Sequence, residues 1–493
     1  MPTGSSTETS SGHDPEAVKR HPALFRAVVR RRNPRLRRTD ITVTDERTVR
    51  RAVKAAALGN AMEWFDFGIY SYLAVTIGDV FFPSGSDTVR LLSSLATFAV
   101  AFLVRPLGGL FFGPLGDRVG RKRVLALTMV LMAVGTCAIG LIPSYAAIGF
   151  WSPVLLICFR MLQGFSTGGE YGGAATFIAE YAPDKRRGFF GSFLELGTLA
   201  GYIGAAGLVT VMTSALGSGA MEDWGWRVPF LVAGPLGLVG LHLRLRLEDT
   251  PAFRKLEEEN AVESGEGTEL KQIFTAYWQR LLLCVVLAGA YGITDYMLLS
   301  YMPTYLTDEL DYDDTHGLLI LIATMALLMV VITFVGRLSD RVGRKPLLMA
   351  GMGGFALLSA PAFLLLKQGG IIAVSGGMLM LGLPLVCLLG TMSAALPALF
   401  PTAVRYGSLS IGYNLSTSLF GGTTPLVITG LIGATGSDMA PAFYTMGAAL
   451  IGMVAVACMK ETAQQPLEGS PPSVSTKEEA AEIAAAQAPE PRF

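Results

Sequence analysis

The amino-acid sequence predicts an all-α integral membrane protein, with twelve transmembrane helices in two pseudo-symmetric six-helix bundles. Three observations predict this fold class: the composition, the number and length of the apolar segments, and a motif that occurs once in each half of the chain. Hydrophobic residues make up 51% of the 493 residues and charged residues only 16%, with a mean hydropathy of +0.47. An average soluble protein carries about 25% charged residues. The composition therefore argues against a soluble enzyme of several globular domains, whose surface needs more charge.

The apolar segments have the length that a membrane requires. A hydrocarbon core of about 30 Å needs about 20 apolar residues in a helix, and a helix satisfies its backbone polar groups internally. We predict twelve such helices, at about 54–77, 91–113, 124–143, 152–178, 188–213, 228–247, 280–305, 317–336, 346–366, 371–397, 407–432 and 439–459. They divide the chain into a basic, largely disordered arm at 1–53, a first bundle at 54–247, a linker at 248–279, a second bundle at 280–459 and a polar tail at 460–493 that we expect to be mostly disordered.

Lys and Arg concentrate on alternate loops, which indicates an orientation. The first 54 residues contain thirteen of these bases, and the loops after the second, fourth and eighth predicted helices are basic as well. The loop after the seventh helix is acidic instead. Because positively charged loops stay in the cytoplasm, we expect both termini there, in a multi-pass protein of a bacterial-type inner cell membrane. The Arg-rich arm either contacts anionic lipid headgroups or only fixes the topology.

A hexapeptide recurs with every residue unchanged, as Asp117-Arg-Val-Gly-Arg-Lys122 and as Asp340-Arg-Val-Gly-Arg-Lys345. Two similar six-helix halves are typical of secondary transporters. The Gly before each copy permits close approach of two helices, and the Asp can bond the first turn of a helix in the other half. We expect the motif to act as a gate that holds one face closed in one state and opens in the other, through Gly113, Asp117, Arg118, Gly120, Arg121, Gly336, Asp340, Arg341, Gly343 and Arg344. The alternative is that its bases only fix the topology.

With the preceding Gly, this motif resembles the signature loop of the major facilitator superfamily. Further segments resemble its metabolite:proton symporter family, and within it the proline/betaine transporter branch: Gly59-Asn-Ala-Met-Glu-Trp-Phe-Asp-Phe-Gly68, Arg105-Pro-Leu-Gly-Gly109, Gln163-Gly-Phe-Ser-Thr-Gly-Gly-Glu-Tyr171 and Tyr296-Met-Leu-Leu-Ser-Tyr-Met-Pro303. The resemblance covers about residues 55 to 465 and implies the major facilitator fold and import of a small osmolyte with protons. Two features depart from it: the tail lacks the apolar heptads of a coiled coil, and Asp295 stands where that branch leads us to expect an uncharged residue.

Polar and ionisable residues inside the predicted helices indicate a function, because their burial in a membrane is unfavourable. We expect substrate binding by Asn60, Trp64, Phe67, Tyr70, Arg160, Gln163, Tyr171 and Tyr291, and proton coupling by Glu63, Asp66, Glu170 and Asp295. The guanidinium of Arg160 suits a carboxylate, aromatic rings suit a secondary or quaternary ammonium, and a desolvated carboxylate can accept a proton. The alternatives are a structural lock for Arg160 and Glu170, and packing for the aromatic rings. Arg105 and Glu195 either take part or brace helices near the cytoplasmic end.

Together these features favour a secondary active transporter that imports a small zwitterionic osmolyte, such as proline or glycine betaine, with protons by alternating access. Rival interpretations are a symporter of a dicarboxylate or other organic acid, an efflux antiporter, and a non-transporting membrane sensor on the same fold. The sequence contains no P-loop, zinc-protease or serine-hydrolase motif, so we expect neither an enzyme nor ATP-driven transport. We expect no cofactor, no metal and no nucleic-acid partner, and a monomer that contacts membrane lipids.

Overall fold

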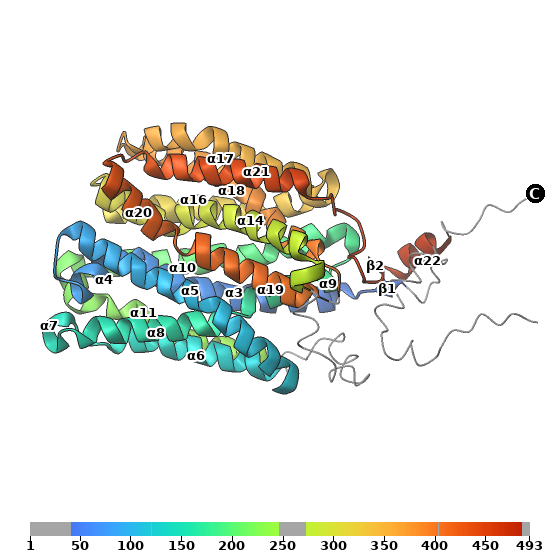
Figure 1. Cartoon of the computed structure of the whole chain (residues 1–493), viewed down its shortest axis with the longest axis horizontal. Coiled ribbons are helices and arrows are strands. Elements are labelled where there is room, and N and C mark those ends of the chain that lie inside the picture. The colour runs from blue at the N-terminus through green and yellow to red at the C-terminus, as the bar shows by residue number, and fades with distance from the viewer. Residues whose placement is uncertain (1–40, 120, 246–272, 403, 486–493) are drawn as a thin grey trace, which may run out of the picture.

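The computed structural model describes residues 41–119, 121–245, 273–402 and 404–485. Within these ranges, the side chains at 113–114, 116–119, 121–123, 125, 218, 240–245 and 485 are outside the description. Long helices run side by side along one axis, and both ends of the described chain lie at the same end of the bundle (Figure 1).

Each half of the chain forms six membrane spans from helices that are partly interrupted. The first half consists of α3 (Glu46–Tyr72), α4 (Ala74–Phe81), α5 (Asp87–Val119), α6 (Arg121–Leu141), α7 (Tyr145–Ile148), α8 (Trp151–Thr167), α9 (Glu170–Tyr181), η2 (Asp184–Arg186), α10 (Arg187–Ala220), η3 (Met221–Gly225) and α11 (Arg227–Leu245). The second half consists of α14 (Trp278–Asp295), η5 (Tyr296–Tyr301), α15 (Met302–Thr304), η6 (Tyr305–Glu309), α16 (Asp314–Val342), α17 (Arg344–Leu366), α18 (Ile371–Ala395), η7 (Pro397–Leu399), α19 (Arg405–Ser416), η8 (Thr417–Gly421), α20 (Thr424–Thr435) and α21 (Ala440–Cys458).

The twelve predicted spans all coincide with helices. Eight helical segments of the described chain are long and apolar enough to cross a membrane by themselves. The other four predicted spans fall on α3 with α4, on α6, on α8 with α9, and on α11. The first of these begins with a charged turn, and the third is interrupted at Gly168 and Gly169. Helices α6 and α11 border residues outside the description. The fold is therefore the predicted pair of six-helix bundles in a membrane protein.

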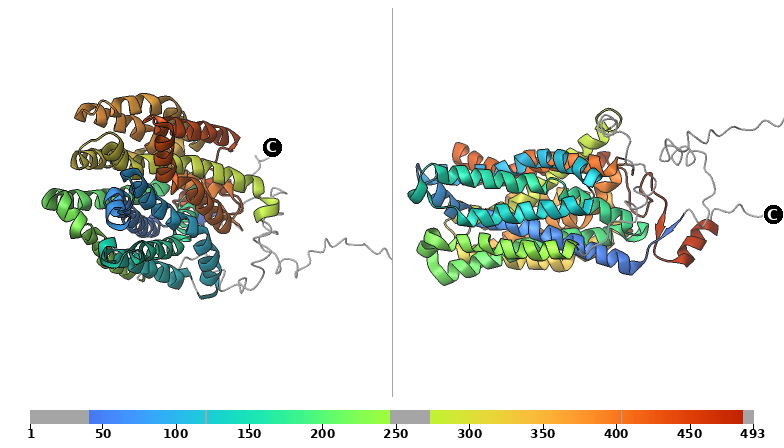
Figure 2. Two further views of the ribbon diagram at one scale, coloured as in Figure 1. Left: turned by 60° about the vertical axis from the view of Figure 1, so that its left-hand side comes forward. Right: turned by 90° about the horizontal axis from the view of Figure 1, so that it is seen from below.

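The two halves meet along their long inner helices. Helix α10 packs against α16, α5 packs against α19 and α20, and α3 packs against η5. In Figure 1 the first half, blue to green, lies below the second half, yellow to red, and Figure 2 shows the same pairing from two further directions. Residues on these inner helices are therefore the ones placed between the halves.

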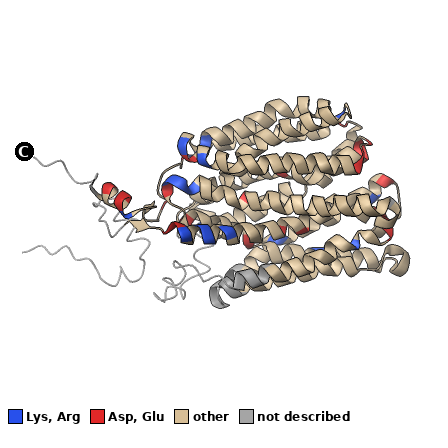
Figure 3. Cartoon of the chain, turned by 180° about the vertical axis from the view of Figure 1, so that it is seen from behind, with Lys and Arg blue, Asp and Glu red and all other residues tan. Residues whose placement is uncertain are grey.

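Charged side chains distinguish the two ends of the bundle. Lys and Arg gather at the end next to the chain termini, while Asp and Glu prevail at the opposite end (Figure 3). We call them the basic end and the acidic end. The basic end carries Lys185, Arg186, Arg341 and Lys345, and the acidic end carries Asp79, Asp87, Asp308, Glu309 and Asp311.

The seventh span changes from an α-helix to wider π-helical turns near its centre, at η5 and again at η6. Pro303 lies between these turns and has no backbone N–H, so it cannot donate to the carbonyl of Leu299. The hydroxyl of Tyr72 donates to that carbonyl at 2.7 Å, and the hydroxyl of Ser71 donates to the carbonyl of Ser300 at 2.7 Å. The irregular backbone of the second half is thus bonded by α3 of the first half.

The segment after α21 differs from the predicted disordered tail. Strand β2 (Ser473–Val474) pairs in parallel with β1 (Thr42–Val43), and α22 (Lys477–Ala485) packs on them with Ile41 and Ala480 buried. The prediction was wrong over 461–485 because the partners of this polar segment come from distant loops, which composition does not reveal.

This C-terminal segment contacts both halves at the basic end. Arg187 donates through Nη1 to the carbonyl of Gln465 at 3.0 Å, and Arg405 donates through Nη2 to the carbonyl of Glu468 at 3.0 Å. These two buried arginines occupy similar loops of the two halves, after the fourth and tenth spans. The amide of Ser473 also donates to Asp184 at 3.1 Å.

The boundary between the N-terminal arm and the first helix lies earlier in the chain than predicted. Residues 41–53 form β1 and the first turns of α3, so the first helix begins at Glu46 rather than 54. The rest of the arm, and the linker up to residue 272, lie outside the described residues.

Candidate functional site

A buried ion pair joins the first two spans of the first half. Arg105 on α5 donates to Glu63 on α3 at 2.6 Å, and neither side chain is more than 2% exposed. The Nε and Nη1 atoms of Arg105 have no hydrogen-bond partner among the described residues. Two donors of this guanidinium are therefore left for a ligand or water.

A second guanidinium lies nearer the acidic end and is more fully bonded. Arg160 on α8 donates to Gln163 and to the carbonyl of Phe98, and it stacks 4.1 Å from the ring centre of Tyr70. Gln163 in turn donates to Thr136 at 2.8 Å, and the Thr136 hydroxyl donates to Asp66 at 2.9 Å. The structure thus brings four predicted site residues into one network, linked through a threonine that the sequence analysis did not single out.

A carboxylate cluster crosses the boundary between the halves. Glu195 on α10 accepts hydrogen bonds from Tyr171 at 2.6 Å, from Thr198 at 3.0 Å and from Tyr291 at 3.4 Å. Tyr291 belongs to the second half. The ring of Tyr171 stacks on that of Tyr413, also of the second half, with centroids 3.8 Å apart.

Two predicted site residues make contacts that also suit a bracing role. Asn60 donates to the carbonyl of Leu194 at 2.8 Å and to Thr198 at 2.7 Å, which joins α3 to α10. Glu170 accepts from Thr128 at 3.0 Å. Both residues are buried within the first half.

An aromatic cluster and an acid occupy the centre of the bundle. Trp64 packs against Tyr202 and Tyr296, with ring centroids 5.3 and 5.6 Å away. Asp295, next to Tyr296, lies in the middle of the span Trp278–Glu309 and is close enough to Glu195 for their charges to interact. This acid therefore belongs to the interior and not to the outer mouth of the bundle.

The halves are joined at the acidic end by α3 and η5. Beside the carbonyl bonds of Ser71 and Tyr72, the hydroxyls of Ser71 and Ser300 lie 2.6 Å apart. Nearer the centre of the bundle, Ser418 of η8 donates to the carbonyl of Phe102 at 2.5 Å. This face is closed by direct contacts.

The halves are joined at the basic end through the second copy of the repeated hexapeptide. Asp340 accepts from the amides of Gly188 and Phe189 at 2.7 and 2.8 Å, at the N-terminus of α10, where the helix dipole favours a negative charge. A Cβ atom on Gly336 would lie 2.7 Å from the carbonyl of Gly188, so only glycine fits this crossing. Arg405 also pairs with Glu180 of the first half at 2.7 Å.

The structure describes the remaining predicted gate residues of the second copy, but not the side chains of the first copy. Gly343 has a φ of +115°, which suits a turn between α16 and α17, and Arg344 is buried and donates to the carbonyl of Ala394 and to Thr462. Arg341 is exposed. In the first copy, Gly120 and the side chains of Gly113, Asp117, Arg118 and Arg121 lie outside the described residues.

Comparison with known proteins identifies the family. The model of the family described as "Sugar (and other) transporter" matches residues 52–472. The chain belongs to this family, in the major facilitator superfamily. It is 47% identical to the "Proline/betaine transporter" of Escherichia coli strain K12 over 450 residues, which are 90% of each chain. It is 44% identical over 471 residues to the "Ectoine/proline transporter ProP" of Corynebacterium glutamicum, covering 93% of this chain and 94% of the relative.

Solved structures agree with the major facilitator fold. The proton:xylose symporter XylE, solved with 6-bromo-6-deoxy-D-glucose, superposes with a TM-score of 0.70 at 19% identity, covering 85% of this chain and 98% of XylE. At this identity the likeness concerns the fold alone.

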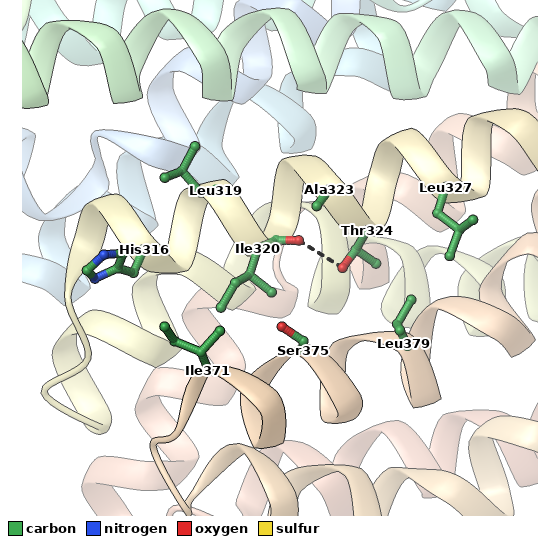
Figure 4. A pocket seen from close by; sticks show the side chains of 9 residues that line it. All are labelled: His316, Leu319, Ile320, Ala323, Thr324, Leu327, Ile371, Ser375 and Leu379. Carbon is green, nitrogen blue, oxygen red and sulfur yellow. Dashed lines mark hydrogen bonds between the residues drawn. The ribbon is translucent and has the colours of Figure 1, made fainter.

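A pocket of about 420 Å³ opens elsewhere, between α16 and α18 (Figure 4). Apolar side chains such as Leu319, Ile320 and Leu379 line it, with His316 at one end and Thr324 and Ser375 as further polar groups. None of the buried ionisable residues described above lines it. We therefore place the candidate site at the buried polar clusters of this transporter and not at this pocket.

Sequence reasoning missed several residues of the interior. Arg105 and Glu195 were predicted either to take part or to brace helices, and their contacts with the predicted residues Glu63, Tyr171 and Tyr291 are a finding of the structure. Tyr202, Tyr296 and Tyr413 gave no signal, because a tyrosine in an apolar helix looks like a packing residue. Within the described residues, no group of three or more His, Cys, Asp or Glu side chains could hold a metal ion.

Proposed function

We propose that this transporter imports a small zwitterionic osmolyte, such as proline or glycine betaine, together with protons. The names of its relatives support the substrate class, since those with 47 and 44% identity are a proline/betaine and an ectoine/proline transporter. The observation that carries the proposal is the buried Glu63–Arg105 pair, with Asp295 and Glu195 in the same interior, because such groups inside a membrane protein mark a ligand or ion path.

The site residues divide by chemistry. A substrate carboxylate would bind the guanidinium of Arg160 or of Arg105, and the cationic group would face aromatic rings, with Asn60, Gln163 and Tyr291 as polar neighbours. The proton would bind one of the buried acids: Glu63, Asp66, Glu170 or Asp295. Coupling requires that protonation change the affinity for substrate, or the balance between the two facing states.

Alternating access would use the contacts at the two ends as gates. The basic end, with both termini, would face the cytoplasm, in line with the positively charged loops. Opening to the outside would break the bonds of Ser71 and Tyr72 to η5, and opening to the inside would release Asp340 from the N-terminus of α10. The first copy of the hexapeptide, in the loop after the second span, would hold the same end closed in the same state. We further propose a monomer whose basic arm contacts anionic lipids.

The proposal is tested by uptake into proteoliposomes that contain the purified protein. Labelled proline and glycine betaine should accumulate when the outside is more acidic than the lumen, and they should only equilibrate without a pH gradient. Competition by dicarboxylates but not by betaine would instead indicate an organic-acid symporter. Binding without any uptake would indicate a sensor.

A further inference from the structure

The aromatic cluster at the centre of the molecule combines rings from both halves. Trp64 on α3 and Tyr202 on α10 belong to the first half, and Tyr296 on η5 belongs to the second. Their centroids lie 5.3 and 5.6 Å from that of Trp64, and each side chain is at most 3% exposed. A change in the distance between the halves therefore changes this cluster directly.

Polar atoms in this cluster have no hydrogen-bond partner. They are Trp64 Nε1, the hydroxyls of Tyr202 and Tyr296, and Asp295 Oδ1, all among the described residues. Buried polar groups in folded proteins are normally bonded, so unbonded ones that converge call for a ligand or water. Asp295 directly precedes Tyr296 in the chain and both side chains are buried, so the acid adjoins this cluster.

The other aromatic residues predicted to meet a cation are already engaged. Arg160 lies 4.1 Å from the ring centre of Tyr70 and 5.4 Å from that of Phe67. Tyr171 stacks face to face on Tyr413. Among the described residues, no Lys or Arg side chain lies over the rings of Trp64, Tyr202 and Tyr296.

A group that can bind the carboxylate of a zwitterion, the guanidinium of Arg105, lies near the cluster. Arg105 keeps Nε and Nη1 unbonded while Nη2 holds Glu63. Its guanidinium is 5.5 Å from the ring centre of Phe102, and that ring is 5.3 Å from the ring of Tyr296. The ring of Phe102 thus connects the cluster to a guanidinium that has two unbonded donor atoms.

We propose that Trp64, Tyr202 and Tyr296 form an aromatic cage, with Asp295 as its acid, for the ammonium group of a zwitterion whose carboxylate binds Nη1 of Arg105. This inference rests on the proposed function and names the subsite within it. A cation between aromatic faces is attracted by their quadrupoles, most strongly when it is desolvated. Nη1 of Arg105 has no hydrogen-bond partner among the described residues, so it can donate to the carboxylate in a charge-assisted hydrogen bond. Arg160, bonded to Gln163 and stacked on Tyr70, then holds the first half together and does not bind the carboxylate.

The proposal explains why the helix is irregular at this point. Tyr296 is the first residue of η5, where the seventh span leaves regular α-helical geometry. In transporters, interrupted helices near the bilayer centre commonly line the substrate site. The cage is narrow when empty, so the halves must separate to admit an ammonium group and can close on it afterwards.

Three probes test the two parts of the subsite separately, by calorimetric titration of the purified full-length protein. Glycine betaine carries both charges, tetramethylammonium carries only the cation, and 3,3-dimethylbutanoate has the shape of betaine without the positive charge. Tyr296→Leu should raise the Kd of glycine betaine and of tetramethylammonium about tenfold and leave that of 3,3-dimethylbutanoate within about twofold. Tyr296→Phe keeps the ring and should have a smaller effect.

Arg105→Lys should show the opposite pattern. It keeps a positive charge beside Glu63 but loses the planar guanidinium. The Kd of glycine betaine and of 3,3-dimethylbutanoate should rise about tenfold, and that of tetramethylammonium should stay within about twofold. Tyr301→Leu is the matched control, since Tyr301 is a buried tyrosine of the same helical turn whose hydroxyl bonds Thr429 instead. It should leave all three constants within about twofold. Thermal unfolding of each variant checks that it folds.

The outcome also separates this inference from the proposed function. If Tyr296→Leu weakens 3,3-dimethylbutanoate as much as betaine, if the wild type binds none of the probes, or if Arg105→Lys leaves betaine binding unchanged, the cage is wrong, whether or not proteoliposomes accumulate betaine. If the probes behave as expected but a pH gradient drives no uptake, the cage stands and the symport proposal fails.

Discussion

Among single residues, the Glu63–Arg105 pair has the clearest energetic consequence. Both groups are withdrawn from water, so removing Glu63 leaves the buried charge of Arg105 without its carboxylate partner. Such a loss typically destabilises a protein by about 3–5 kcal/mol, whereas replacing both charges has a much smaller effect.

We therefore predict that Glu63→Gln lowers both the stability and the proton-driven uptake of this transporter. The loss of stability should be about 3 kcal/mol, measured by unfolding of the purified protein. Adding Arg105→Gln should restore most of the stability but not the transport. If the single and the double variant lose equal stability, the charges of Glu63 and Arg105 do not compensate each other.

Glu461, outside the membrane spans, provides a pH-dependent contact. It accepts from the amides of Arg344, Lys345, Thr462 and Ala463, at the N-terminus of α17. Partial burial raises its pKa, but these amide bonds outweigh burial and hold the pKa below the ordinary value of 4.5. Because the pKa is lower in the folded state, the contribution to stability is complete above pH 4.5 and is lost as the pH falls through the folded pKa.

We predict that the C-terminal segment is released by acid. Limited proteolysis within residues 461–485 should be slow at pH 7 and faster near pH 3.5, with an acid-active protease for both conditions. In Glu461→Gln the cleavage rate should be raised at pH 7 and should change little with pH. If the wild type and the variant follow the same pH profile, another group controls the segment.

At the level of helices, the bonds between α3 and η5 allow a matched comparison on one helix. Tyr72 donates across the halves to Leu299, while Tyr70 donates to Ser94 within its own half. Each hydroxyl contributes about 1 kcal/mol as a hydrogen bond, but only the first holds the acidic end closed.

Tyr72→Phe should therefore shift the protein toward opening at the acidic end, and Tyr70→Phe should not. The shift can be measured as faster alkylation of a cysteine introduced at Ser300. About a fivefold increase is expected for a bond of this strength. Equal rates in the two variants would mean that the Tyr72 bond does not contribute to closure.

We predict that the C-terminal segment helps to keep the basic end closed. Arg187 and Arg405 hold backbone carbonyls of this segment, so a side-chain change such as Glu468→Ala should alter closure little, because only its exposed pair with Arg280 is lost. Deletion of residues 464–493 should increase labelling of a cysteine at Ser192, on α10 near the basic end. If the deletion leaves that labelling unchanged, the segment does not restrain the basic end.

Helices were predicted better than their interruptions. The apolar segments were long enough to show all twelve spans, and the repeated hexapeptide anticipated the bond from Asp340 to the start of α10. The π-helical turns around Pro303 and the strand pair of residues 42–43 with 473–474 could not be foreseen. Both depend on partners that are distant in the sequence. The π-helical turns are bonded by Tyr72, and each strand needs the other one as its partner. The same holds for the candidate site. Charged residues within the spans can be read from the sequence, but the packing of Trp64 against Tyr202 and Tyr296 cannot, because the three rings come from distant parts of the chain.

For the whole molecule, the claim is that two closed bundles enclose buried charges in order to move a zwitterion with a proton. The bonds at both ends, the halves that share the aromatic cluster, and the acids beside it are parts of one arrangement. A scaffold alone would not need unbonded donors on Arg105 or an unbonded oxygen on Asp295 in its interior.

The most direct test of this claim is the movement of protons caused by the substrate itself. Proteoliposomes in weakly buffered medium, with no imposed pH gradient and with valinomycin and potassium to prevent a membrane potential, receive glycine betaine on the outside. The account predicts that the medium becomes more alkaline as betaine enters, and that the lumen becomes more acidic. Entry of betaine with no change in pH on either side would contradict it.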